Sequence, residues 1–268
     1  MSVAALPMYD LAEVGWANDA LWSGIVACAR AEGLGGLPAR LTRDRPAEAV
    51  YADPGLVFAQ ACGYDITHAF AGRLRVVATP VYAAPGAEGP AYASVLIVGE
   101  DAPAAGLGDL AGAVCAINGW GSHSGMNALR AAVAPLQRGG RFFARVRVSG
   151  SHLASVAMVA AGEADVAAID CVTHALLARH RPGALAGTRV LGWSARAPGL
   201  PFVTRADESA ATIAPLRAAL RAAIAEPRLA PARDALLLAG VTVLPDDAYD
   251  RILAFEREAA RAGYPVLA

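Results

Sequence analysis

The fold is decided by the stretch Asn118-Gly119-Trp120-Gly121-Ser122-His123-Ser124-Gly125-Met126-Asn127. The apolar residues 113–117 before it form a short buried-strand pattern, and the alanine-rich residues 126–133 after it favour a helix. The loop therefore ends at a helix N-terminus, where backbone N–H groups lack partners and the helix dipole is positive. A strand, loop and helix of this kind can stabilise an anion without any basic side chain.

The side chains in this loop support the same interpretation. Ser122 and Ser124 add hydroxyl donors, while Gly121 and Gly125 let the backbone approach a ligand closely. His123 lies between the two serines and is a further candidate. The alternative is that one serine only caps the helix, as serine often does.

Composition sets broad limits on the function. The chain has 268 residues, of which 56% are hydrophobic and 18% charged, so it can bury a sizeable core in one large or two small domains. Its formal net charge is −1, and no basic stripe predicts a nucleic-acid partner. The apolar stretches are shorter than the roughly 20 residues that a membrane-spanning helix needs, so membrane insertion is not expected.

Alternating strands and helices predict an α/β protein with two lobes, each a mainly parallel sheet flanked by helices. Lobe 1 is expected over residues 1–80 plus 203–268, and lobe 2 over 81–202, with hinge crossings near 80–94 and 195–204. In lobe 1 we predict strands at 3–7, 37–41, 56–60 and 74–82 and helices at 13–32 and 46–51. In lobe 2 we predict strands at 92–98, 113–117, 142–148, 164–170 and 190–193. The residues after 204 are predicted to be helical, best at 215–224, 231–239 and 246–262.

Three junctions between a strand and a helix in lobe 2 carry polar residues at equivalent places: Ser122 with Ser124, Ser151 with His152, and Asp170 with Thr173. Parallel strands end at one edge of their sheet, so these junctions are expected to converge there. His152 can donate to an anionic oxygen, and Asp170 can bind a ligand ammonium or a protonated oxygen. For both, a role as a helix cap is the open alternative.

Tyrosines form the second group of candidates. Tyr9, Tyr64, Tyr82 and Tyr92 all lie near predicted strand ends or the first crossing. A tyrosine offers an apolar ring and one hydroxyl, which suits a small polar ligand with a short alkyl part. Ordinary packing is the alternative, and it is expected for at least two of them.

Catalytic and metal motifs are not found. Residues 121–125 do not have the spacing of a Gly-x-Ser-x-Gly nucleophile elbow, and no Cys-x-x-Cys or Cys/His zinc pattern is present among the four cysteines. We therefore expect no catalytic residue, no metal and no cofactor, although an enzyme is not excluded.

These features resemble the phosphate, phosphite and phosphonate-binding proteins of ABC importers, a group with the type II periplasmic-binding-protein fold. The resemblance extends from residue 6 to about residue 204 and rests on residues 122–127, Gly150-Ser151-His152, residues 162–170 and the hinge at 82–94. In that family the serine-rich helix start and a histidine hold the phosphonate, and tyrosines and acidic residues contact the rest of the ligand. The resemblance implies these roles for Ser122, Ser124, His152, Tyr9, Tyr64, Tyr92 and Asp170.

The leading hypothesis is a solute-binding protein that closes two lobes over a small oxyanion such as phosphonate or phosphate for an ABC transporter permease. The candidate ligand-binding residues are Tyr9, Tyr64, Tyr92, Ser122, His123, Ser124, Gly125, His152, Asp170 and Thr173. The alternatives are a cytoplasmic enzyme on the same fold, of the menaquinone- or thiamine-precursor type, and a ligand sensor. The chain starts without a signal peptide, which predicts the cytoplasm, or the periplasm if a leader has been removed.

Overall fold

The computed structural model describes residues 1–268, which divide into two compact units. Unit 1 contains Met1–Ala83, Glu88–Pro90 and Pro198–Ala248, and unit 2 contains Ala84–Ala87, Ala91–Ala197 and Tyr249–Ala268. The chain passes between the units around residues 83–91, at residues 197–198, and again at residues 248–249. A two-stranded sheet of β4 (Ala91–Tyr92) and β10 (Ala197–Pro198) lies where the first two of these passages occur. No helix is both long enough and apolar enough to cross a membrane.

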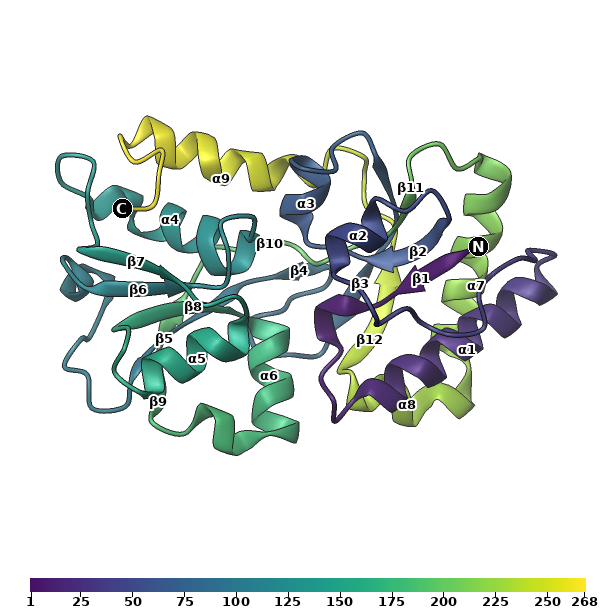
Figure 1. Ribbon diagram of the computed structural model, residues 1–268, viewed down its shortest axis with the longest axis horizontal. Helices are drawn as coiled ribbons and strands as arrows, with labels where there is room; N and C mark the ends of the chain where they lie inside the picture. The colour runs from purple at the N-terminus through teal and green to yellow at the C-terminus, as the bar shows by residue number, and fades with distance from the viewer. The chain divides into compact units, whose positions relative to one another are not determined.

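Unit 1 is built on a five-stranded sheet in the order β1-β2-β11-β3-β12. Its strands are β1 (Val3–Ala5), β2 (Leu56–Gln60), β3 (Leu74–Tyr82), β11 (Phe202–Arg205) and β12 (Leu238–Thr242). Its helices are α1 (Gly15–Ala31), α2 (Ala47–Tyr51), α3 (Gly63–Thr67), α7 (Ala210–Ala225) and α8 (Ala230–Ala235). Helices α1, α7 and α8 lie on one face of the sheet and α2 and α3 on the other (Figure 1). A stack of Trp22 on Phe58 and of Phe58 on Phe202, with ring centroids 5.4 and 5.2 Å apart, forms the centre of the core on the α1 side.

Unit 2 is built on a second five-stranded sheet, in the order β7-β6-β8-β5-β9. Its strands are β5 (Ser94–Gly99), β6 (Val114–Ile117), β7 (Arg145–Val148), β8 (Val166–Asp170) and β9 (Thr188–Trp193). Its helices are α4 (Ala128–Val133), α5 (His152–Ala160), α6 (Cys171–His180) and α9 (Asp250–Arg261). Helices α4 and α9 cover one face of this sheet, and α5 and α6 cover the other (Figure 1).

Both sheets are mixed, whereas the sequence predicted mainly parallel ones. In unit 1, β11 is inserted between β2 and β3 and runs antiparallel to both, and β12 runs antiparallel to β3. In unit 2, only β5 opposes its neighbours β8 and β9. β5 and β11 are the first long strands after the chain crosses into unit 2 and back into unit 1, whereas β12 follows α8 within unit 1.

Two local predictions in unit 1 are wrong. Residues 37–41 form no strand, because the segment makes a single backbone hydrogen bond to β1, from Thr42 N to Ala4 O at 2.7 Å. The helix predicted at 231–239 ends at Ala235, and β12 follows it as a strand on the free edge of β3. Leu237 joins the two with φ of 56°, a left-handed conformation that ends the helix.

The C-terminal segment Tyr249–Ala268 packs in unit 2, whereas the sequence analysis assigned residues 203–268 to lobe 1. Arg130 of α4 explains this packing. Its guanidinium donates to Glu256 Oε1 at 3.0 Å and to Pro265 O at 2.9 Å, and Asn127 Nδ2 donates to Ile252 O at 3.1 Å. These contacts join residues more than a hundred positions apart, so no local pattern could reveal them.

Candidate functional site

Three parallel strands of unit 2 end at one edge of its sheet, and a helical segment follows each of them. β6 lies between β7 and β8, and it is parallel to both. The predicted convergence of the three polar junctions therefore has a structural basis, since the segments that begin at His123, His152 and Cys171 all start at this edge (Figure 1). We call the starts of these three segments, with their capping residues Ser122, Ser151 and Asp170, the polar edge.

Ser122 is the N-cap of the first segment. Its Oγ accepts a hydrogen bond from Gly125 N at 3.0 Å, as the capping alternative predicted. Residues His123–Asn127 then form a π-helical turn before α4 begins. Such turns are rare in proteins, and those that occur are often found at functional sites. A Cβ built on Gly125 would lie 1.9 Å from Asn118 Oδ1, so the turn fits against the end of β6 only with glycine at this position.

Ser124 and His152 bring the first two junctions into contact. Ser124 Oγ lies 2.8 Å from His152 Nε2, a hydrogen bond between a π-helical turn and the first residue of α5. Ser151 caps α5, since its Oγ accepts from Ala154 N at 3.1 Å. Burial of the imidazole lowers the pKa of His152 to about 4, although the residue as a whole is partly exposed at the helix start. The buried ring of His152 is therefore neutral at pH 7.

Ser94 links the third junction to the first, and the sequence analysis did not name it as a candidate. It is opposite Asp170 in the β5–β8 ladder, and its Oγ donates to the carbonyl of Ser124 at 2.9 Å. Its own N–H donates to Ser194 Oγ at 2.8 Å. Its hydroxyl is buried, and the only hint in the sequence is a serine before the apolar run 95–98.

Asp170 is the N-cap of α6. Its Oδ1 accepts hydrogen bonds from Val172 N at 2.8 Å and from Thr173 N at 3.0 Å, and its side chain is buried. The capping role left open by the sequence is therefore present. A ligand-binding role for Asp170 and Thr173 stays a prediction.

His123, which the sequence named as a candidate ligand-binding residue, is buried in the interior of unit 2. Its ring packs edge-on against Phe255 at 5.0 Å and lies 6.2 Å from the buried Tyr92. Asn127 Nδ2 donates to its Nδ1 at 3.1 Å, so that nitrogen carries no proton. Burial, with a contribution from Arg251, lowers the pKa of His123 to about 3. The ring is neutral and serves in packing.

The other predicted tyrosines belong to unit 1. Tyr9 follows β1 and meets Tyr82, at the end of β3, edge-to-face with ring centroids 5.1 Å apart. Gln60, the last residue of β2, donates to Tyr82 Oη at 3.1 Å. Tyr64 is stacked on His68 at 3.8 Å, within α3 and its C-cap. Aromatic rings and one amide group therefore lie at the strand ends of unit 1.

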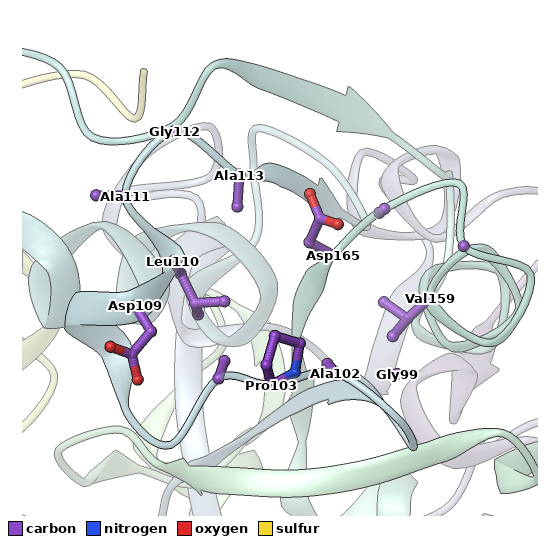
Figure 2. Close-up of a pocket in the computed structure, with 13 residues that line it drawn as sticks. Gly99, Ala102, Pro103, Asp109, Leu110, Ala111, Gly112, Ala113, Val159 and Asp165 are labelled. Carbon is purple, nitrogen blue, oxygen red and sulfur yellow. The ribbon is translucent and has the colours of Figure 1, made fainter.

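A cavity of about 610 Å³ lies at the opposite edge of the unit 2 sheet, where β6 and β8 begin. Its lining is mainly alanine, glycine and proline with Leu110 and Val159, and its two charged side chains are Asp109 and Asp165 (Figure 2). Asp109 accepts hydrogen bonds from the backbone N–H groups of Ala105 and Gly106, and Asp165 accepts one from that of Val114. With acidic groups and no basic side chain, this cavity does not suit an oxyanion, so the polar edge is the better candidate.

The described residues include no cluster of potential metal ligands and no reactive buried thiol. No three His, Cys, Asp or Glu side chains are grouped so that they could hold a metal ion. All four cysteines are free thiols, and burial raises the pKa of Cys115 and of Cys171 to about 12. These two thiols are therefore protonated and poor nucleophiles at pH 7.

Known proteins share this architecture. Residues 57–249 match the model of the family described as the phosphonate periplasmic substrate-binding protein of ABC transporters. A binding protein component of an ABC phosphonate transporter from Pseudomonas aeruginosa is similar, with 19% identity, 98% of this chain and 88% of that chain covered, and a TM-score of 0.75.

Two further solved structures are similar over nearly the full length. PhnD1 from Prochlorococcus marinus, in complex with methylphosphonate, has 14% identity, covers 97% of this chain and 98% of its own, and gives a TM-score of 0.73. XAC2383 from Xanthomonas citri, bound to ATP, has 18% identity, 98% coverage of both chains and a TM-score of 0.72. No curated protein sequence matches the chain.

Proposed function

Since the chain belongs to the phosphonate-binding family of periplasmic substrate-binding proteins of ABC transporters, we propose that it binds a small phosphorus oxyanion, a phosphonate or phosphate, at the polar edge of unit 2. The observation that carries this proposal is the contact between Ser124 and His152 at 2.8 Å, which joins two helix starts at adjacent strand ends. A permease of an ABC transporter is the proposed partner, and the periplasm the proposed compartment, because both are properties of the family.

The chemistry of the polar edge supports an oxyanion. Ser122 accepts from Gly125 N, which leaves its own hydroxyl hydrogen for an acceptor. The starts of α5 and α6 orient further backbone N–H groups toward the same edge. Hydrogen bonds from neutral donors to an anion are short and strong, so no arginine is needed. The expectation that Tyr9 and Tyr64 of unit 1 contact the same ligand stays a prediction.

Calorimetry tests the proposal directly. Phosphate, phosphite, methylphosphonate and aminoethylphosphonate are titrated into the protein at pH 7, and at least one is expected to bind. Ser122→Ala is expected to weaken that binding by roughly 10- to 100-fold, the value of one hydrogen bond to a charged group.

A matched control separates ligand binding from helix capping. Ser209 caps α7 in unit 1 with the same geometry, its Oγ accepting from Thr212 N at 3.2 Å. Ser209→Ala removes a comparable cap and is expected to leave the affinity unchanged. The absence of heat with all four anions, confirmed by unchanged thermal unfolding, would contradict the proposal.

A further inference from the structure

The π-helical turn of the polar edge is defined by two backbone hydrogen bonds. The N–H of Asn127 donates to the carbonyl of Ser122 at 3.1 Å, and the N–H of Ala128 donates to the carbonyl of His123. Each bond spans five residues, whereas the bonds of an α-helix span four. The turn therefore has a register that differs by one residue from that of an α-helix.

This register leaves the carbonyl of Ser124 for another donor. In an α-helix that carbonyl would accept from the N–H of Ala128, four residues further on. Ala128 is bonded to His123 instead, and the hydroxyl of Ser94 on β5 donates to the Ser124 carbonyl at 2.9 Å. Ser94 is almost fully buried, and a buried carbonyl without a donor costs free energy. Ser94 therefore supplies the hydrogen bond that the π-helical register needs.

Asn127, the last residue of the turn, is held by its side chain. Its Nδ2 donates to Ile252 O of α9 at 3.1 Å and to His123 Nδ1 at 3.1 Å, and its Oδ1 accepts from Arg130 Nη2 at 2.6 Å. The orientation of this amide is fixed, because a guanidinium only donates and a carbonyl only accepts. The end of the turn is thus attached to α9, as its middle is attached to β5.

The register determines where the side chain of Ser124 points. Successive residues of a helix are rotated by about 100° around its axis, so a slip of one residue would turn a side chain by that angle. Ser124 is the second residue of the turn, and its Oγ lies 2.8 Å from His152 Nε2. A rotation of this size would separate the two atoms.

We infer that Ser94 and Asn127 are positioning residues for the polar edge: they hold the turn in its π-helical register and so keep Ser124 against His152. The inference rests on the proposed function and adds to the same site two residues that act through Ser124. Neither was a candidate from the sequence, because the partners of both come from distant segments of the chain.

The first test is made without a ligand, by NMR of the imidazole nitrogens. The ring signals of His152 are identified as those that disappear in His152→Gln. Ser94→Ala is expected to move these signals in the same direction as Ser124→Ala does, because both variants remove the contact between Ser124 and His152.

Thr188→Val is the matched control for Ser94→Ala. The Thr188 hydroxyl is also on a strand of the unit 2 sheet and donates to a backbone carbonyl, that of Leu185, at 2.7 Å. It lies opposite Gly99, at the other end of β5 from Ser94. This variant is expected to leave the His152 signals unchanged.

The second test is calorimetry at pH 7 with methylphosphonate and with phosphate. Ser94→Ala is expected to lower the affinity for the anion that binds by roughly 3- to 10-fold, the equivalent of one hydrogen bond between neutral groups. Ser94→Cys keeps a weak donor and is expected to give an intermediate affinity. Thr188→Val is expected to bind as the wild type does.

Asn127→Leu tests the attachment to α9 and is expected to lower the affinity by at least as much as Ser94→Ala. Gln137→Leu is its control, because Gln137 Nε2 likewise donates to a backbone carbonyl of this region, that of Ala262 at 2.9 Å, from outside the turn. Its affinity is expected to equal that of the wild type.

Unmoved His152 signals in both Ser94→Ala and Asn127→Leu, or moved signals with unchanged affinity, would overturn this inference alone. Absence of binding of both anions by the wild type would overturn the proposed function and, with it, the role of these residues in binding. If Ser94→Ala does not fold, as judged by circular dichroism, Ser94→Cys and Asn127→Leu decide the question.

Discussion

The strand ends of the two units have the same chain topology and different chemistry. In unit 1 a parallel pair of strands leads to short helical turns, and the side chains found there are the rings of Tyr9 and Tyr82 and the amide of Gln60. In unit 2 parallel strands lead to helical segments that begin with Ser122, Ser124 and His152. The comparison shows that similar topology carries different side chains, hydroxyl and imidazole groups in unit 2 and aromatic rings with an amide in unit 1. This difference is the reason that we propose unit 2 as the anion site.

One titratable group in each unit, Asp65 and His123, is expected to change the stability of the protein in opposite directions as the pH falls. Burial and the neighbouring carboxylate of Glu48 raise the pKa of Asp65 in unit 1 to about 6, whereas burial lowers the pKa of His123 in unit 2 to about 3. A folded state that binds protons more readily than the unfolded chain gains stability as the pH falls, and one that binds them less readily loses it.

The largest expected effect tests this difference. From pH 6.5 to 4, His123 alone should lower the free energy of unfolding by about 3 kcal/mol, because its pKa returns to about 6.5 on unfolding. Over pH 6 to 4, Asp65 should raise the free energy of unfolding. Urea denaturation as a function of pH measures both contributions, with His123→Asn expected to reduce the acid sensitivity and Asp65→Asn to increase it. Identical pH profiles for the wild type and both variants would contradict the assignment.

An intermediate effect is expected at the π-helical turn of unit 2. Gly125→Ala places a Cβ against Asn118 and should cost about 1–3 kcal/mol of stability, together with much of the oxyanion affinity, because the turn must move. Gly192→Ala in β9 of unit 2 is the matched control, since no atom lies within 4 Å of its added Cβ. Thermal unfolding and calorimetry measure the two effects. Equal affinities for the two variants would show that the position of the turn is not critical.

The smallest effect is expected at the strand ends of unit 1. Tyr9→Phe keeps the edge-to-face contact with Tyr82 and removes only a hydroxyl. Stability should change by less than about 1 kcal/mol, and oxyanion affinity by less than about tenfold if the role of unit 1 is that of an apolar wall. A larger loss of affinity, measured by the same calorimetry, would show that this hydroxyl contacts the ligand and that the two units share the polar contacts.

Periodicity and loop composition predicted much of the architecture. The strands at β2, β3, β5 and β8 and the helix α1 are recognisable because each buries a continuous or periodic apolar face, a signal that is local in the chain. β12 was missed because the alanine- and leucine-rich sequence before it favours a helix, and only the free edge of β3 makes a strand stable there.

Within the candidate site, the sequence located the three junctions but not their internal roles. Ser124 and His152 were predicted to converge, and they are in contact. The sequence could not show that His123 differs in role from the serines beside it. Its burial depends on contact with Phe255 of α9, which is more than a hundred residues away along the chain. Ser94 was not recognised for the same reason, since its partner Ser124 is thirty positions distant.

The sequence by itself determined that strands alternate with helices and that small polar residues occupy the helix starts of one lobe, because these properties follow from backbone preferences and burial within short segments. Only the tertiary structure decided that the ring of His123 packs in the interior of unit 2, that the C-terminal helix belongs to unit 2, and that Ser124 contacts His152. Those outcomes depend on contacts between segments that are distant in the chain, which no local pattern of residues specifies.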